Sequence, residues 1–236
     1  MTRHQAIPKV FILTLEAHDR SEALQSMLRA QNVEYQVVFG IDGRNGLPAE
    51  YEAQIEREKT KTVFGREMSD GEYACALSHQ LIYQKIIEQG LKRAVVFEDD
   101  ALPLSAFFAL ERDYFEAKDL TLLYHYNTYV RRSAPNAQAH PEILPLNNSP
   151  FMACAYIIAA PTAQLILEHA RPIVSPADWP IELGDINAGA AWPYMAEHIG
   201  QKTSNLSDKR PKSLRKSIDK NYIRTKKRKL LGKKIA

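Results

Sequence analysis

The sequence predicts an α/β domain in which a mostly parallel central sheet is flanked by helices. The first observation is the segment KVFILTL at residues 9–15, a continuous apolar run typical of a strand buried on both faces of a parallel sheet. An amphipathic helix is expected at residues 21–31 and a second strand at residues 35–39. Strand, helix and strand in this order form the repeating unit of α/β folds, whose ligands gather at the carboxyl ends of the strands.

A second helix start is visible in the middle of the chain. Ser69 and Glu72 have the spacing of a capping box, in which each side chain bonds the backbone N–H of the other residue. Gly90 is expected to end this helix, because glycine readily adopts the conformation that follows a last helical turn. Residues 48–66 are strongly charged and predict a surface helix or a mobile loop. The remaining elements expected are strands at 94–97, 120–124 and 152–159, a helix at 162–170 and an ordered loop region at 172–193.

The distribution of charge separates an acidic body from a basic tail. The net charge of the 236 residues is only +3, yet residues 202–236 hold 14 Lys and Arg against two Asp. The other 201 residues hold 17 Lys and Arg against 26 Asp and Glu. We therefore expect one domain at residues 1–205 and a basic amphipathic tail at residues 206–236.

The tail has the pattern of a helix that lies on a membrane surface. Leu214, Ile218 and Tyr222 are four residues apart and share a helix face, and basic residues fill the other positions. Such a helix is attracted to anionic lipids. A solvated disordered tail is the alternative; a nucleic-acid partner is not expected, because the acidic body offers no continuing basic groove. Further apolar residues of the tail are Leu230, Leu231 and Ile235.

Membrane spans and disulfides are not expected. No run approaches the roughly 18 apolar residues of a spanning helix, and the first residues lack the cleavage site of a signal peptide. We expect a cytoplasmic protein, held peripherally on the inner face of the cytoplasmic membrane. Cys75 and Cys154 stand in apolar surroundings, which indicates reduced core thiols.

Three carboxylates follow the expected strand at 94–97 directly. If strand geometry persists, Glu98 and Asp100 share one side and Asp99 points to the other. Adjacent carboxylates repel one another, so each must be solvated, hydrogen-bonded or paired with a cation. A hard ion, Mn²⁺ or Mg²⁺, would satisfy one or two of them. Spacing alone leaves both a solvated turn and a metal site open.

The preceding helix carries Ser78 and His79 on an otherwise apolar face. Such a pair is either a hydrogen-bonded core pair or part of a site. The sequence has no Gly-x-Ser-x-Gly elbow, which argues against a Ser-His hydrolase. It also lacks Gly-x-Gly-x-x-Gly and Walker-type loops, which argues against dinucleotide-binding and P-loop folds.

Taken in order, several blocks resemble glycosyltransferase family 25, the family of bacterial lipooligosaccharide galactosyltransferases that also includes collagen-type galactosyltransferases. The blocks are FILTLEAHDR (11–20), FGIDG (39–43), GEYACALSHQLIYQKI (71–86), VVFEDDA (95–101), ACAYIIA (153–159) and PADWP (176–180). The resemblance implies a GT-A-like fold, a UDP-galactose donor and a divalent metal, Mn²⁺ or Mg²⁺, at the acidic run.

The resemblance also assigns site residues. Asp100 and Glu98 become the metal ligands, and Asp99 or Glu98 supports the donor sugar and ribose. This chain has Thr14-Leu15-Glu16 where the family commonly has Asn-Leu. The donor-binding residues implied are Thr14, Leu15, Glu16, Arg20, Asp42, Gly43, Ser78, His79, Glu98 and Asp99.

The implied reaction is an inverting transfer. Negative charge grows on the β-phosphate as the sugar leaves UDP, and a metal stabilises this charge. Arg20 either acts as a second cation or forms an ordinary surface ion pair. A base must take the acceptor proton from the opposite side; Asp178 is the candidate, unless it is a turn former, and Asp185 is the reserve. Trp179 either stacks on the acceptor sugar or belongs to the core.

The sequence thus predicts an inverting, metal-dependent enzyme that transfers galactose from UDP-galactose to a terminal sugar of bacterial lipooligosaccharide, as a β-1,4-galactosyltransferase does. One alternative keeps the fold and replaces the donor by UDP-glucose or a UDP-N-acetylhexosamine. The other, of a different class, is a nucleic-acid-binding protein that acts through its basic tail.

Overall fold

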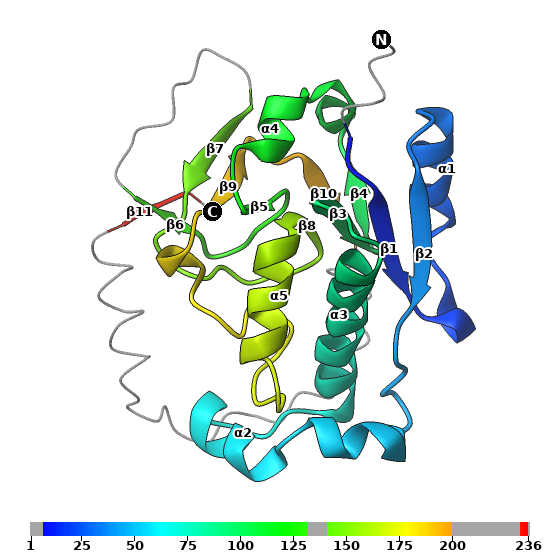
Figure 1. The fold of residues 1–236 in the computed structure, drawn as a ribbon, viewed down its shortest axis with the longest axis vertical. Coiled ribbons are helices and arrows are strands. Elements are labelled where there is room, and N and C mark those ends of the chain that lie inside the picture. The colour runs from blue at the N-terminus through cyan, green and yellow to red at the C-terminus, as the bar shows by residue number, and fades with distance from the viewer. Residues whose placement is uncertain (1–6, 132–140, 200–231, 236) are drawn as a thin grey trace.

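The computed structural model describes residues 7–131, 141–199 and 232–235, and a seven-stranded sheet forms its centre, in the order β2-β1-β3-β8-β5-β9-β7 (Figure 1). Five strands run in one direction, and β8 and β7 run in the other. The predicted α/β class with a mostly parallel sheet is therefore confirmed. The strands are β1 Val10–Thr14, β2 Tyr35–Phe39, β3 Arg93–Glu98, β5 Leu120–Leu122, β7 Glu142–Pro145, β8 Ala155–Ala159 and β9 Ala188–Trp192.

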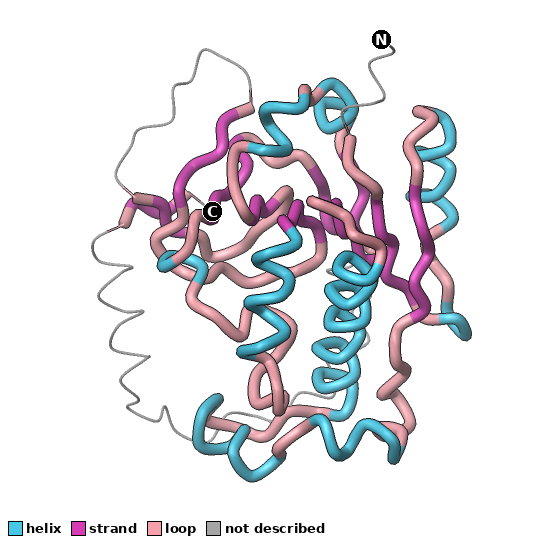
Figure 2. Tube along the Cα trace, viewed as in Figure 1, coloured by secondary structure: helices cyan, strands magenta, loops and turns pink. Residues whose placement is uncertain are grey.

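Helices cover both faces of this sheet. Helices α3 and α5 lie side by side on one face (Figures 1 and 2). Helix α1 packs on the other face through Leu24 and Leu28, the two buried residues of the helix expected at 21–31. The α-helices are α1 Glu22–Ala30, α2 Arg57–Phe64, α3 Asp70–Glu88, α4 Arg112–Glu116 and α5 Ala160–His169, and the 3-10 helices are Glu16–His18, Ala49–Gln54, Ser105–Ala109 and Leu183–Asp185.

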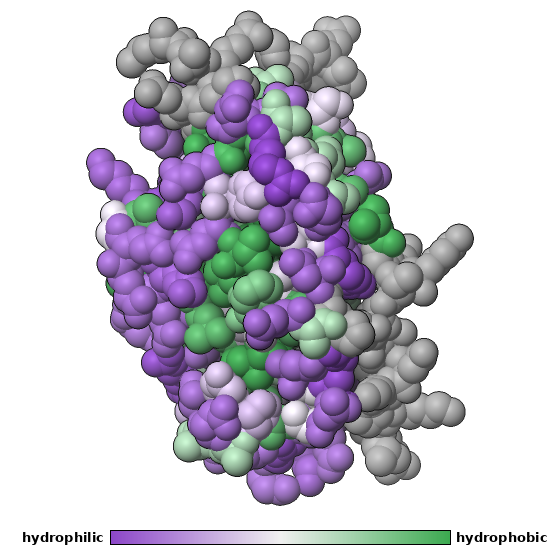
Figure 3. All heavy atoms as spheres, turned by 90° about the vertical axis from the view of Figure 1, so that its right-hand side faces the viewer, coloured by the Kyte–Doolittle hydropathy of each residue, from purple (hydrophilic) through white to green (hydrophobic). Residues whose placement is uncertain are grey.

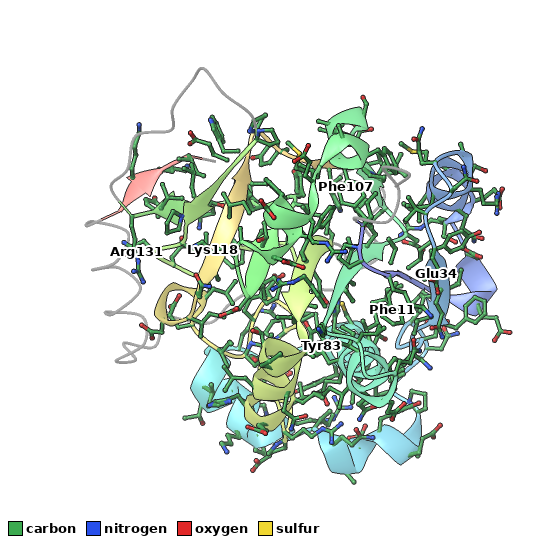
Figure 4. The ribbon with its side chains drawn as sticks, turned by 45° about the horizontal axis from the view of Figure 1, so that its top comes forward. Phe11, Glu34, Tyr83, Phe107, Lys118 and Arg131 are labelled. Atoms are coloured by element: carbon green, nitrogen blue, oxygen red, sulfur yellow. The ribbon has the colours of Figure 1, made fainter. Side chains whose placement is uncertain are left out.

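Strand β1 supplies side chains to two separate hydrophobic cores. Phe11 belongs to the core under α3 and α5 together with Tyr83, and Phe107 belongs to the opposite core (Figure 4). Ile12 belongs to the same core as Phe107. Because successive side chains of a strand point to opposite faces, a strand between two cores must be apolar throughout. All five residues of β1 are buried, as its uninterrupted apolar run predicted.

Helix α3 begins at the predicted capping box. The Ser69 hydroxyl accepts the N–H of Glu72 at 3.3 Å, and the Glu72 carboxylate accepts the N–H of Ser69 at 2.9 Å. The helix ends at Glu88, and Gly90, with a φ of 62°, follows its last turn in the left-handed region that favours glycine. Strand β3 starts three residues later, so α3 and β3 are joined by a short, well-defined turn.

Several strands were missed from the sequence. Strand β9 lies within residues 172–193, expected to be loops, and its sequence AGAAW lacks the β-branched residues typical of strands. Small residues serve here because β7 approaches closely: a side chain at Gly189 would collide with Ile143. Strand β7 was not expected either. The other missed strands form two small ribbons, β4 Ala101–Pro103 with β10 Ala196–His198, and β6 Tyr129–Val130 with β11 Lys233–Lys234.

The described end of the tail is a strand. Lys233–Lys234 pair with β6, the N–H of Ile235 donates to Thr128 at 3.0 Å, and Ile235 packs against the core under α5. Ile235 therefore does not extend an apolar helix face. The other apolar residues on which the helical tail was predicted, Leu214, Ile218, Tyr222, Leu230 and Leu231, lie outside the described residues. The division at residue 206 stays a prediction.

Strand β2 forms one edge of the sheet. Of its five residues only Val38 is buried, and Phe39 is 49% exposed. Figure 3 views the molecule from the side of β2 and α1 and shows an apolar patch in the middle of a largely hydrophilic face. Within the described ranges, no helix combines the length and the apolar character that crossing a membrane requires.

The loop after β2 packs directly on the first turn of α3. A Cβ atom at Gly43 would lie 2.8 Å from the Ala74 Cβ and closer still to the carbonyl oxygen of Asp70. Gly43→Ala should therefore lower the free energy of unfolding by about 1–3 kcal/mol in urea titrations. Asn45→Ala, on the exposed part of the same loop, should change it by less than about 0.5 kcal/mol. Equal stability of both variants would mean that α3 does not depend on this close contact.

Candidate functional site

Two neighbouring parallel strands bring the acidic run next to the first loop of the chain. Strands β1 and β3 are paired so that Leu13 lies beside Glu98, and the N–H of Asp99 donates to the carbonyl of Leu13 at 3.0 Å. Their carboxyl ends therefore meet at one edge of the sheet. The residues that gather at this edge are Thr14, Arg20, Glu98, Asp99 and Asp100.

The three carboxylates have different nearest partners. The sequence predicted that Glu98 and Asp100 share one side, but β3 ends at Glu98 and Asp99 and Asp100 form a turn before β4. Strand alternation does not extend into a turn, so the condition on which this expectation rested is not met. The shortest contact of each carboxylate is with a different element, and Arg20 lies near both Asp99 and Asp100.

Asp99 is bound to Arg20. The Arg20 Nη2 donates to Asp99 Oδ1 at 2.6 Å, and its Nε lies 3.4 Å from Oδ2. Thr14 donates its hydroxyl to the same Oδ2 at 2.8 Å. The hydrogen bond to Asp99 raises the pKa of Arg20, and Arg20 also lies 3.6 Å from Asp100. Asp99 therefore fixes the loop after β1 and holds a cation beside Asp100.

Glu98 faces α3. Its Oε1 lies 3.0 Å from His79 Nε2, and His79 Nδ1 lies 2.8 Å from the hydroxyl of Tyr156. That hydroxyl donates to Tyr83 at 3.2 Å, so a chain of hydrogen bonds leads from the carboxylate into the core. Burial raises the pKa of Glu98; the hydrogen bond to His79 lowers it, and the negative charges of Asp100 and Asp178 raise it.

Ser78 serves the scaffold. Its hydroxyl accepts the N–H of Ile41 at 2.8 Å and donates to the carbonyl of Ala74 at 2.6 Å. The loop after β2 is thereby tied to α3. Since His79 faces Glu98 instead, Ser78 and His79 do not form a catalytic pair.

The other residues assigned to the donor are spread over the same edge. Asp42 accepts hydrogen bonds from the Nε of Arg44 at 2.8 Å and from its backbone N–H at 3.0 Å. Leu15 is partly buried, and Glu16 is exposed in the 3-10 helix that follows β1. Gly43 is required by the contact with α3, as described above. Three of the assigned residues contact the acidic run directly: Thr14, Arg20 and His79.

Asp100 has a partner that the sequence did not reveal. The pairing of β10 with β4 places His198 beside Ala101, and His198 Nε2 lies 3.4 Å from Asp100 Oδ2. The hydrogen bond to Asp100 raises the pKa of His198. The imidazole stacks on Tyr124, with ring centroids 5.8 Å apart. A three-residue strand with the sequence AEH carries no pattern that could have identified this histidine.

Asp100 and His198 fit a hard divalent cation. Asp100 Oδ1 is buried and has no hydrogen-bond partner in the part of the chain that the structure describes. His198 faces Asp100 through Nε2, so that nitrogen is the one that could share an ion with Asp100. Such an orphaned carboxylate oxygen is an unusual cost unless an ion or water binds it. Carboxylate oxygen suits Mg²⁺ and Mn²⁺, and imidazole is an acceptable further ligand for Mn²⁺.

A second group of potential ligands lies deeper. The ligand atoms of Cys75, His79 and Glu98 are all within 4.8 Å of one another. Thiolate and imidazole suit softer ions such as Zn²⁺. Burial raises the pKa of the Cys75 thiol well above its usual value, so the thiolate that a metal requires is disfavoured. Of the two predicted metal ligands, Asp100 is therefore better placed than Glu98, whose carboxylate faces His79.

Asp178 is oriented by two backbone groups. Its Oδ1 accepts the N–H of Met152 at 3.0 Å and of Ala153 at 3.1 Å. The next residue, Cys154, accepts the N–H of Glu98 at 2.7 Å. The segment 152–154 therefore connects Asp178 to the end of β3. Asp178 both shapes this turn and lies near the acidic run.

Trp179 and Asp185 do not lie where an acceptor subsite was expected. Trp179 is 5% exposed and packs edge-on against Tyr156, with ring centroids 5.3 Å apart, so it is a core residue. Asp185 is exposed and precedes β9, whose first residue, Ala188, pairs with the first residue of β5. Asp185 therefore lies toward the amino end of these strands, away from the edge formed by Glu98.

The division of partners among the carboxylates can be measured with double-mutant cycles. In EDTA, Arg20→Ala combined with Asp99→Ala should give a coupling energy of about 1–2 kcal/mol in urea unfolding, because two hydrogen bonds join these side chains. Arg20→Ala combined with Asp100→Ala should give less than about 0.5 kcal/mol, because the separation is 3.6 Å and Arg20 is 40% exposed. Equal coupling in both cycles would contradict the assignment of Arg20 to Asp99.

Comparison with known proteins gives partial relatives. Procollagen galactosyltransferase 1 of Danio rerio is 29% identical over 111 residues, which are 45% of this chain and 18% of the relative. The probable inactive glycosyltransferase 25 family member 3 of Bos taurus is 30% identical over 96 residues, 39% of this chain and 16% of the relative. This chain thus spans less than a fifth of the length of these curated relatives.

Similarity to solved structures is weak. The protein A197 from STIV has a TM-score of 0.40 and 12% identity, with 78% of this chain and 81% of that chain covered. A glycosyltransferase involved in glycosylation of the major capsid of PBCV-1 has a TM-score of 0.34 and 7% identity, with 70% and 66% covered. No conclusion about function rests on similarities of this size.

The family itself is shown by the sequence. Residues 7–181 match the family model of glycosyltransferase family 25, described as an LPS biosynthesis protein. The matched range begins before β1, includes the acidic run and ends just after Trp179, so it covers most of the described site. The chain belongs to glycosyltransferase family 25.

Proposed function

We propose that this chain is an inverting, metal-dependent glycosyltransferase that transfers galactose from UDP-galactose to a terminal sugar of bacterial lipooligosaccharide. The observation that carries the proposal is the acidic run at the carboxyl end of β3. Glu98 and Asp99 are engaged by His79 and by Arg20, whereas Asp100 keeps a buried carboxylate oxygen without a partner among the described residues. A divalent cation and the diphosphate of a nucleotide sugar would suit this arrangement.

Each residue of the edge has a role in the proposal. Asp100 and His198 would hold Mn²⁺ or Mg²⁺, which, when bound, neutralises the charge that develops on the leaving diphosphate. Arg20 adds a second positive charge beside Asp100, at a position fixed by Asp99. Glu98, held by His79, is placed to accept a hydrogen bond from a hydroxyl of the donor sugar or ribose.

Asp178 is the proposed base. Inversion requires that the acceptor hydroxyl attack from the side opposite to the diphosphate, and a carboxylate there takes up its proton. Two backbone N–H groups fix the orientation of Asp178, and its charge acts on Glu98. An oriented carboxylate near the donor site, but on a different element from the metal ligands, suits this role.

The relatives and the distribution of charge support the proposed donor, acceptor and location. The zebrafish relative is named a galactosyltransferase, which supports galactose over the alternatives, UDP-glucose and a UDP-N-acetylhexosamine. The family is described as LPS biosynthesis, which supports a lipooligosaccharide acceptor. The basic residues 202–236 would then hold the enzyme on an anionic membrane surface near a lipid-linked acceptor. Relatives described as inactive make turnover itself the first property to measure.

Turnover of a donor panel tests the proposal. With Mn²⁺ and β-linked glucose, N-acetylglucosamine and galactose acceptors, we expect transfer from UDP-galactose in preference to UDP-glucose and both UDP-N-acetylhexosamines, and loss of transfer in EDTA.

Asp100→Asn should lower kcat/KM on the order of 100-fold, as removal of a group that stabilises developing charge does. Asp178→Asn should retain UDP binding and lose transfer.

The matched control is Asp113→Asn, an exposed aspartate on α4, which should have unchanged kinetics. Turnover that is insensitive to EDTA would contradict metal dependence. Equal turnover of all donors would contradict the choice of galactose. Full transfer by Asp178→Asn would exclude it as the base.

A further inference from the structure

Two exposed aromatic side chains face solvent as a pair. Tyr126 is 58% exposed, the most of any large apolar residue among those described, and Phe151 is 50% exposed. The N–H of Tyr126 donates to the carbonyl of Phe151 at 3.3 Å, and the N–H of Phe151 donates back at 3.0 Å. Residues that exchange both hydrogen bonds in an antiparallel pair place their side chains on the same side. The two exposed side chains therefore project from the same side of this short ladder.

The backbone around the pair is held in place. His125, which precedes Tyr126, lies 2.8 Å from the Thr128 hydroxyl through Nδ1 and donates from Nε2 to the carbonyl of Ala191 at 3.1 Å. The residue after each aromatic, Asn127 and Met152, has a positive φ, 59° and 81°. Such conformations cost roughly 1–3 kcal/mol and persist only where surrounding structure enforces them. The exposed rings are thus carried by fixed segments.

One route through the structure leads from the acidic run to this pair. Glu98 donates its N–H to Cys154, and Phe151 lies three residues before Cys154. At about 3.3 Å per extended residue, Phe151 is at most roughly 10 Å from that contact. Between them lie Met152 and Ala153, whose N–H groups orient Asp178. The proposed base is therefore bound to the segment that links Phe151 to the end of β3.

A second, independent route ends at the same place. Asp100 contacts His198, and His198 stacks on Tyr124. Tyr126 is two residues beyond Tyr124, a further distance of at most about 7 Å. Both routes start at the candidate metal and donor residues and end at Tyr126 and Phe151. An acceptor must approach the proposed base, and Phe151 directly precedes Met152, whose N–H binds Asp178.

We propose that Tyr126 and Phe151 form the subsite for the acceptor glycan, with the rings against the apolar C–H face of a β-linked pyranose. Aromatic rings offer a large, rigid contact surface for such a face, and polar groups nearby fix the orientation of the sugar. This subsite replaces Trp179, which is buried. The inference rests on the proposed function, since it names the site of the second substrate.

Saturation-transfer NMR tests the subsite directly. The full chain, with UDP and Mn²⁺, is mixed with lactose, cellobiose or N-acetyllactosamine, and the transfer from protein to sugar protons is recorded. We expect transfer to the C–H protons of one pyranose face, and its loss in Tyr126→Ala/Phe151→Ala. The conservative variants Tyr126→Phe and Phe151→Tyr should retain it. Ile87→Ala, an exposed apolar residue at the end of α3, is the control and should match the wild type.

Kinetics separate this subsite from the donor site. The double alanine variant should raise KM for the acceptor about tenfold or more, while its affinity for UDP and its hydrolysis of the UDP-sugar stay unchanged. Unchanged acceptor KM and unchanged saturation transfer would overturn the subsite. Unchanged acceptor KM with lost binding to vesicles of anionic phospholipid would also overturn it and assign the pair to a membrane surface. If the wild type transfers sugar from none of the UDP-sugars, the proposed function fails, yet saturation transfer still decides whether the pair binds a glycan.

Discussion

Three adjacent carboxylates at the end of a buried strand are the constraint on which this site depends. Their mutual repulsion would be costly at the edge of a core unless each had its own partner. The structure distributes them over three elements: Glu98 to His79 on α3, Asp99 to Arg20 after β1, and Asp100 to His198 on β10. The contacts of Glu98 with His79 and of Asp99 with Arg20 pair these carboxylates with other parts of the fold. The third leaves one oxygen of Asp100 without a partner among the described residues, and this asymmetry supports the proposal that Asp100 binds a cation.

The scaffold makes this distribution possible. Parallel pairing of β1 with β3 brings the loop that carries Arg20 beside Asp99. The capping box starts α3 at Asp70, and the packing of Gly43 and Ser78 ties the loop after β2 to the same helix, so His79 faces Glu98. The pairing of β10 with β4, which directly follows the turn, then places His198 beside Asp100.

Sequence patterns predicted the elements whose signals are local. The apolar run of β1, the capping box of α3 and the strand before the acidic run are all confirmed. Strand β9 was missed because the close approach of β7 requires small residues there, and a local sequence pattern does not reveal such a tertiary contact. His198 was missed for a similar reason: its contact with Asp100 joins residues almost a hundred positions apart. Trp179 was ambiguous in sequence, because aromatic residues serve cores and sugar sites alike, and only its 5% exposure decided between them.

The location of a bound metal tests the central claim most directly. Anomalous diffraction from crystals of the full chain grown with Mn²⁺ and UDP should place the ion on the carboxylate of Asp100 and the imidazole of His198, with Arg20 still bound to Asp99. An ion between Cys75, His79 and Glu98, or one that draws Asp99 away from Arg20, would contradict the division of roles among the three carboxylates.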